Sequence, residues 1–222
     1  MGEINLLDRY PRSVRPIDER GSCITEDHRR VARRFGKEYF DGERLTGYGG
    51  YSYHPRFWRD TVKRFVEFYG LTEESKILDV GCAKGYMLYE FKQLLPGLSI
   101  TGIDISEYSI AKSPEAIRPY LQIANAKELP FADDEFDLVI SINTIHNLEL
   151  DECKQALKEV KRVSKNHTFV TVDAWRNDME RERLLKWNLT ALTYMHAADW
   201  ELVLEETGYS GDYYWFIADT AA

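Results

Sequence analysis

Two apolar runs end in residues that could together bind a nucleotide: the first in a turn with two glycines, the second in an aspartate. Residues 77–85, ILDVGCAKG, join an apolar run of strand length to a turn that contains Gly81 and Gly85. Glycines in such a turn let the backbone approach a ligand closely, and the helix that follows offers free N–H groups. Asp104 ends the next apolar run, 23 residues after Gly81, where a carboxylate can accept hydrogen bonds from both hydroxyls of a ribose. The set predicts a nucleotide site.

The turn also indicates which nucleotide would fit. It reads G-C-A-K-G, with two glycines four residues apart, and so departs from the G-x-G-x-x-G pattern of dinucleotide sites. Asp79 lies directly before the turn, where it would repel a pyrophosphate but could receive a cation. A ligand with ammonium and sulfonium groups is therefore favoured over NAD. Taken singly, the glycines could simply form a tight turn, and Asp104 could cap a helix.

The glycine turn and Asp104 can form one site only if the fold brings the ends of their two strands together. Short apolar runs alternate with helix-like segments after Gly70. We expect strands at residues 76–80, 99–104, 120–124, 137–142, 167–174 and 212–219, and helices at 86–95, 150–163, 177–187 and 197–207. Strands this apolar, separated by helices, predict an α/β fold: a doubly wound, mainly parallel sheet with helices on both faces. The ligand crevice of such a sheet lies at the carboxyl ends of its strands.

Three motifs in this order resemble one family. ILDVGCAKG, TGIDIS (101–106) and NAKELPFADDEFDLVISINTIHNL (125–148) are similar to a class I S-adenosylmethionine-dependent methyltransferase with its Rossmann-like domain, over about residues 76–173. The resemblance implies S-adenosyl-L-methionine as cofactor and S-adenosyl-L-homocysteine as product. The cofactor-binding residues that it implies are Asp79 near the amino group, Gly81, Cys82 and Gly85 at the methionine end, Asp104 on the ribose, Ile105 on the adenine, Asn125 and Ala126 at the adenine edge, and Asn143 beside the methyl group.

The chain departs from the family pattern in three places. Asn125 stands where the family usually has Asp, although its side-chain oxygen can still accept a hydrogen bond from the adenine amino group. Lys84 replaces a commoner small residue, and we expect it to point to solvent. The strands expected above also leave the chain one strand short of the usual seven.

Methyl transfer needs an aligned acceptor and, for a hydroxyl or amine, a base. His146 follows the fourth strand at the rim of the expected crevice and has a suitable pKa for this role. Asp173, at the end of the fifth strand, is the second candidate. The alternatives are a capping or packing role for His146 and a helix N-cap role for Asp173.

The loop GYGGYSYHPRFW (47–58) is the candidate acceptor site. Tyr48, Tyr51 and Tyr53 could form an aromatic lid, and His54 with Arg56 could contact an anionic group. A loop that merely covers the sheet edge is the alternative.

The N-terminal segment is harder to interpret. Residues 1–24 read as an arm or a disordered tail, and residues 25–40 as a helix. Residues 1–70 would cap an S-adenosylmethionine-binding domain at 71–222, within a single structural domain. Early arginines form either a solvated face or a docking surface for an acidic partner or anionic substrate: positions 9, 12, 15, 20, 29, 30, 33 and 34.

Composition limits the classes of function. The 222 residues carry 29 basic and 37 acidic side chains, a net charge of −8, so a nucleic-acid partner is unlikely. Three cysteines without C-x-x-C spacing favour neither disulfides nor zinc, and no acidic cluster suggests another metal. No apolar run is long enough for a membrane span. We expect a cytoplasmic monomer or homodimer, with the aromatic residues 213–216 in the core or a dimer contact.

The favoured function is methyl transfer to an oxygen, a nitrogen or a carboxylate of a small, anionic metabolite in biosynthesis. A catalytically silent cofactor-binding subunit that supports a partner is the alternative, because binding alone would preserve the same motifs. A nicotinamide-dependent dehydrogenase is weakened by the missing third glycine.

Overall fold

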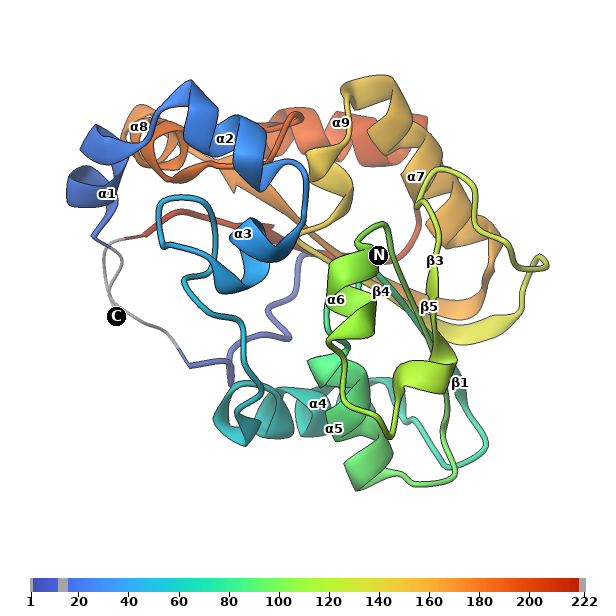
Figure 1. The fold of residues 1–222 in the computed structure, drawn as a ribbon. Coiled ribbons are helices and arrows are strands. Elements are labelled where there is room, and N and C mark those ends of the chain that lie inside the picture. Colours follow the sequence, from blue (N-terminus) through green and yellow to red (C-terminus); the bar gives the residue numbers. More distant parts are fainter. Residues whose placement is uncertain (1, 12–15, 220–222) are drawn as a thin grey trace.

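A seven-stranded sheet forms the centre of the molecule (Figure 1). The computed structural model describes residues 2–11 and 16–219. The strands are β1 (Lys76–Val80), β2 (Ser99–Asp104), β3 (Leu121–Ile123), β4 (Phe136–Ile142), β5 (Ser164–Trp175), β6 (Met195–His196) and β7 (Asp212–Phe216). Their order is β3-β2-β1-β4-β5-β6, with β7 also paired to β5, and each of these pairings is parallel. The predicted mainly parallel α/β sheet is therefore confirmed.

Alternate residues of the central strands enter two separate cores. Ile77 packs in a cluster with Phe65 and Phe91 of the helices on one face. Its neighbour Leu78 packs in a second cluster with Leu157 and Trp200 of the helices on the other face. Because both faces are covered, the strands read as continuous apolar runs rather than as alternating ones.

Helices lie on both faces of the sheet and beyond its end. They are α1 (Ile17–Cys23), α2 (Glu26–Ala32), α3 (Lys37–Asp41), α4 (Pro55–Tyr69), α5 (Tyr86–Leu94), α6 (Glu107–Ala111), α7 (Leu150–Arg162), α8 (Asp178–Trp187) and α9 (Ala197–Glu206), with short 3₁₀ turns at Arg118–Tyr120 and Ile145–Asn147. In Figure 1, α1 and α2 lie beside α8 at the upper left. Ile17 of α1 is buried against Leu184 of α8. The N-terminal helices are thus held at the edge of the sheet that carries the carboxyl ends of β5 and β6.

Of the two alternatives for residues 1–24, an arm or a disordered tail, the disordered tail is wrong for residues 2–6. The Tyr213 N–H donates to the Gly2 carbonyl at 3.1 Å, and the Ile4 N–H donates to the Tyr213 carbonyl at 2.8 Å. Leu6 is 0% exposed. Residues 2–4 therefore pair with β7, and Leu6 anchors the segment in the core. Positions 12 and 15 of the predicted arginine surface lie outside the described residues.

The helix expected at residues 25–40 is broken in two. Phe35 has a φ of 48°, a left-handed conformation that ends α2 and redirects the chain before α3. The capping box at Thr25, whose hydroxyl accepts from the His28 N–H, fixes the start of α2. The apolar spacing of residues 60–69 predicts a helix there, but α4 begins five residues earlier, at Pro55, because proline is favoured at the first helical position.

The sheet is also not one strand short. β6 supplies a strand of only two residues, too short to leave an apolar pattern in the sequence. Among the described residues, no helix is both long and apolar enough to cross a membrane. Nor do any three or more His, Cys, Asp or Glu side chains in these ranges gather in a way that could hold a metal ion.

Candidate functional site

The turn after β1 is shaped for close approach of a ligand. Gly81 and Gly85 have φ values of 84° and 71°. The Ile103 carbonyl accepts hydrogen bonds from the Gly81 and Cys82 N–H groups at 2.8 and 2.9 Å, which ties the turn to β2. A Cβ atom on Gly81 would lie 2.1 Å from the Thr144 hydroxyl oxygen. Glycine is therefore required at this position both by conformation and by space.

Asp104 is held at the end of β2 by backbone groups. One carboxylate oxygen accepts from the Ala83 N–H and the other from the Ser106 N–H, each at 2.8 Å. Burial raises the pKa of this carboxyl, although these backbone hydrogen bonds oppose the rise. The geometry orients the carboxylate toward the crevice, and each oxygen retains a lone pair for a hydroxyl donor.

Asp79 is a buried carboxylate without a cationic partner among the described residues. It is 6% exposed. Burial, followed by repulsion from Asp104, raises the pKa of Asp79 to about 7. No lysine or arginine of the described chain forms an ion pair with Asp79 or Asp104. Two acidic groups in one enclosed region favour a ligand that brings positive charge.

A cavity lies over these strand ends. The predicted residues that line it are Gly81, Asp104, Ile105, Asn125, Ala126, Asn143 and Tyr48. Asp79, Cys82 and Gly85 do not line it. At the far side, the Asn143 side-chain oxygen accepts from the Thr171 hydroxyl at 2.8 Å, which fixes its orientation.

Sequence reasoning missed much of the opposite wall. Phe35, Tyr39 and Phe40 line the cavity together with Tyr48. Thr144, Asn147 and Leu148 were missed as well. The aromatic residues at 35 and 39 carry a helical spacing, which suggests a core face; only their place next to the tyrosine-rich loop hints at a cavity wall. We call residues 35–51 the cap.

Lys84 joins the cap to the turn after β1, so the expectation that it points to solvent is wrong. Lys84 is 4% exposed. Its ammonium group lies 2.7 Å from both carboxylate oxygens of Asp41 and 2.6 Å from the Tyr51 carbonyl. The Tyr108 hydroxyl also donates to Asp41, at 2.8 Å. The buried pair therefore ties the cap to the loops after β1 and β2, both of which border the cavity.

The remaining predicted acceptor residues lie outside the cavity. The Tyr51 ring packs against Tyr48, with ring centroids 4.6 Å apart. Tyr53 donates a short hydrogen bond to the buried Glu90. The His54 ring accepts from the Arg56 N–H and so caps α4. Of the predicted aromatic lid, only Tyr48 reaches the cavity directly.

The two candidate bases are also set back from the cavity. The His146 ring is buried, and its Nδ1 accepts from the Asp173 backbone N–H at 2.9 Å. Burial lowers the pKa of His146, although the Asp173 charge opposes this. The nearer Asp173 carboxylate oxygen is 3.6 Å from the same Nδ1. Because that nitrogen already accepts a hydrogen bond from the backbone N–H, it carries no proton, and we assign a neutral imidazole rather than an ion pair. A base role for His146 or Asp173 has no support from this placement and stays a prediction.

Comparisons with known proteins show the family of the chain. Residues 78–172 match the family described as "Methyltransferase domain". A putative methyltransferase of Encephalitozoon cuniculi is 31% identical over 167 residues, which cover 68% of this chain and 75% of that protein. A tRNA (carboxymethyluridine(34)-5-O)-methyltransferase of Arabidopsis thaliana is 33% identical over 141 residues, or 63% of this chain and 33% of that protein. The chain therefore spans only a third of the plant relative.

The fold is shared with solved structures. A putative methyltransferase from Bacillus halodurans C-125 superposes with a TM-score of 0.51 and 21% identity, over 66% of this chain and 68% of that one.

Proposed function

Because the chain belongs to the class I S-adenosylmethionine-dependent methyltransferases, we propose that it transfers a methyl group from S-adenosylmethionine to a small, anionic acceptor. The observation that supports the proposal most is the cavity between the strand ends and the cap. One wall carries the residues expected for the donor. The other wall is aromatic and comes from a segment outside the matched domain, residues 78–172.

The residues around the cavity fit this donor. The glycine turn leaves room for backbone contact, since a side chain at Gly81 would collide with Thr144. Asp104 offers its remaining lone pairs to the ribose hydroxyls. Asp79, which lacks a cationic partner among the described residues, provides the negative charge that an α-amino group requires. Ile105 is 52% exposed and provides an apolar surface for the adenine.

When bound, S-adenosylmethionine supplies an electrophilic methyl group on a sulfonium. The chain contributes by orienting the two reactants and by excluding water from the space between them. Asn143, whose side chain is fixed by Thr171, borders the place where the acceptor meets the methyl group. A hydroxyl acceptor placed there would have to release its proton to a base or to water as it is methylated.

An RNA acceptor is the second candidate, favoured by the name of the plant relative. The net charge of −8 argues against it, because RNA binding relies on basic surfaces that displace phosphate counterions. The arginines of the N-terminal helices instead suit a compact anionic group.

Isothermal calorimetry and label transfer test the proposal. We expect the purified protein to bind S-adenosylmethionine and S-adenosylhomocysteine. Asp104→Ala should weaken donor binding by about 1–3 kcal/mol, the scale of lost charge-assisted hydrogen bonds. Asp151→Asn, an exposed site on α7, removes the same charge and serves as the control.

Tritiated donor is then incubated with a cell extract separated into small metabolites and RNA. Label in the small-molecule fraction supports the proposal, and label in RNA alone supports the second candidate. Donor binding without transfer to any fraction would indicate a silent subunit and would contradict both.

A further inference from the structure

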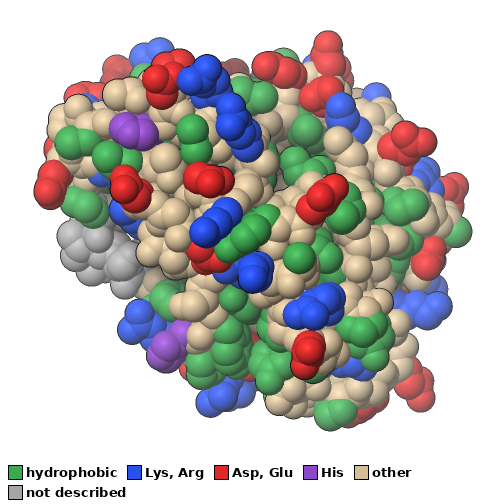
Figure 2. All heavy atoms as spheres, viewed as in Figure 1, with side chains coloured by type: hydrophobic (Ala, Val, Ile, Leu, Met, Phe, Trp, Pro, Cys, Tyr) green, Lys and Arg blue, Asp and Glu red, His purple; other side chains and the backbone are tan. Residues whose placement is uncertain are grey.

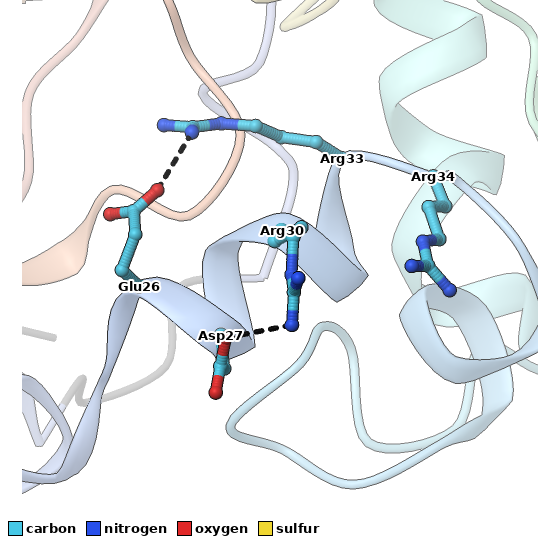
Figure 3. Close-up of a pocket in the computed structure, with 5 residues that line it drawn as sticks. All are labelled: Glu26, Asp27, Arg30, Arg33 and Arg34. Atoms are coloured by element: carbon cyan, nitrogen blue, oxygen red, sulfur yellow. Dashed lines mark hydrogen bonds and ion pairs between the residues drawn. The ribbon is translucent and has the colours of Figure 1, made fainter.

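The N-terminal helices carry a second hollow, beside the cap. It is lined by Glu26, Asp27, Arg30, Arg33 and Arg34, along α2 and the turn that follows (Figure 3). The hollow has a volume of about 470 Å³, within the range of about 300–1,000 Å³ typical of small-molecule sites. Figure 2 shows basic side chains, in blue, gathered over the α2 region on this face. Neither the family match nor the donor site accounts for this hollow.

Its positive charge is only partly neutralised. Arg30 pairs with Asp27 at 2.8 Å, and Arg33 pairs with Glu26 at 3.2 Å. Asp27 and Glu26 are 81% and 73% exposed in their side chains, so these pairs hold the guanidinium groups only weakly. Arg34 forms no ion pair with the described residues.

The three arginines differ in how many of their N–H groups are free to bind a ligand. Arg33 Nε is buried and lacks a hydrogen-bond partner among the described residues. In Figure 3 the Arg30 and Arg34 side chains run in the same direction, Arg30 with its contact to Asp27, whereas Arg33 turns away from them toward Glu26. A planar guanidinium binds the oxygens of phosphate in a bidentate manner, so Arg30 and Arg34 offer the more suitable pair.

The residues that line the hollow end one position before a residue that lines the donor cavity. Phe35 follows Arg34 directly and lines the donor cavity. Its carbonyl accepts from the Ser106 hydroxyl at 2.5 Å, so the turn is fixed to the loop after β2. Phe35 also has a left-handed φ of 48°, a strained conformation of the kind that persists when the surroundings enforce it. The backbone is therefore constrained at the position directly after Arg34.

We propose that Arg30 and Arg34, supported by Arg33, bind a phosphate group of the methyl acceptor and hold the rest of the acceptor toward the donor cavity. This inference rests on the proposed function, because it names the substrate class of the same site. It also replaces the predicted anion contacts at His54 and Arg56. The His54 ring is engaged in capping α4, and the Arg56 guanidinium lies 4.7 Å from the centre of the Phe57 ring.

Phosphate binding is the first test. Inorganic pyrophosphate is titrated into the full chain saturated with S-adenosylhomocysteine, at constant ionic strength, and followed by calorimetry. Arg34→Gln should weaken pyrophosphate binding about 10-fold or more, the scale of a lost charge-assisted hydrogen bond. Lys158→Gln, at an exposed position on α7, removes one positive charge elsewhere and should change it less than twofold.

Equal weakening by both variants, or no pyrophosphate binding by the natural chain, would overturn the proposal. Arg34 is exposed to solvent, so the melting temperature of Arg34→Gln should stay near that of the natural chain. Donor affinity is measured in the same samples and should be unchanged in Arg34→Gln. Loss of donor binding by the natural chain would instead refute the proposed function, so the two failures are distinct.

The labelled product provides the second test. If the acceptor carries a phosphate monoester, the tritiated small molecule formed in extract should bind an anion exchanger and lose that retention after phosphatase treatment. Its yield should fall at least 10-fold with Arg34→Gln and stay unchanged with Lys158→Gln. Label that is insensitive to phosphatase, or a product found only in RNA, would contradict a phosphate monoester on a small acceptor.

Discussion

Asp79 combines burial with a charge that no cation of the described chain offsets. Its raised pKa of about 7 has consequences both for the stability of the free protein and for donor binding. Its neighbours differ in this respect: Asp104 receives two backbone hydrogen bonds that support its charge, and Asp41 pairs with Lys84. At the scale of single residues, the charge of Asp79 is therefore less well stabilised than the charges of Asp104 and Asp41.

Asp79→Asn should remove a pH dependence of stability. Between the ordinary carboxyl pKa near 4 and the pKa of about 7 in the fold, the folded chain holds a proton that the unfolded chain has released. Stability should therefore fall as the pH rises through this window. We expect the variant to gain roughly 2–4 kcal/mol of unfolding free energy at pH 8 and little at pH 4. Urea unfolding at both values measures this.

The same variant should bind the donor more weakly at pH 8, since the amino group loses its anionic partner. An Asp79→Asn protein whose stability follows the natural pH profile would show that Asp79 carries no unusual proton. Asp137→Asn, at a half-buried position whose carboxylate accepts a hydrogen bond from the Lys76 N–H, provides the comparison.

Substitution of His146 tests whether this residue acts as a base or only packs in the core. If it is the base, His146→Ala should lower turnover by roughly 10²–10⁴-fold with little change in donor affinity. Its placement favours a different outcome: a loss of about 1–3 kcal/mol of stability, because a buried ring and its hydrogen bond to the Asp173 N–H are removed. We expect the stability loss and less than a 10-fold loss of turnover. Thermal unfolding and kinetics on the same sample separate the two roles.

At the scale of elements, the cap is the part of the structure that must move. The cavity encloses about 130 Å³, less than the roughly 300 Å³ at the lower end of small-molecule sites. The strand ends are fixed by the sheet, whereas the cap is held by side-chain contacts to Lys84, Tyr108 and Ser106. Opening of the cap is therefore the simplest way to admit the donor.

Asp41→Asn should loosen the cap without unfolding the sheet. The substitution leaves the Lys84 ammonium buried without its counter-charge, which is costly. We expect the donor to dissociate about 10-fold faster and proteolytic cleavage within residues 42–50 to increase. Stopped-flow fluorescence and limited proteolysis measure these effects. Glu43→Gln, an exposed position on the same segment, should leave both unchanged, and equal behaviour of the two variants would contradict the role of the pair.

The sequence reveals strands better than it reveals the cap. β1 and β4 were placed within a residue because strands buried on both faces leave apolar runs. The break at Phe35 was missed, since a left-handed phenylalanine carries no sequence signal apart from the glycine that follows it. Lys84 was misplaced because its partner Asp41 lies 43 residues away, a distance in sequence that no local pattern bridges. The sequence therefore predicts several strand-end residues that line the cavity, and it does not predict the aromatic residues of the cap that line it as well.

At the scale of the whole molecule, the donor site joins elements from most of the chain. Residues of the cap, of the loops after β1 and β2, and of the segment after β4 meet at one cavity. Because the donor would contact the cap and the sheet together, its binding energy adds to the stability of the entire fold.

Saturating donor should raise the melting temperature of the chain. A ligand at 100 times its dissociation constant contributes about 2.7 kcal/mol, and for a chain of this size each kcal/mol raises the midpoint by roughly 2–4 °C. We expect an increase of about 5–11 °C with S-adenosylhomocysteine and none with NAD. Differential scanning fluorimetry measures the shift. An equal shift with NAD would return the dehydrogenase hypothesis to consideration.

The pairing of residues 2–4 with β7 has a further consequence. β7 joins β5 along one side, and its other side would present unsatisfied backbone groups if the first residues were missing. Such an open border can recruit the same border of another copy, which leads to self-association. An affinity tag or a deletion that displaces residues 2–4 would thus promote self-association of the protein, although these residues do not line the cavity.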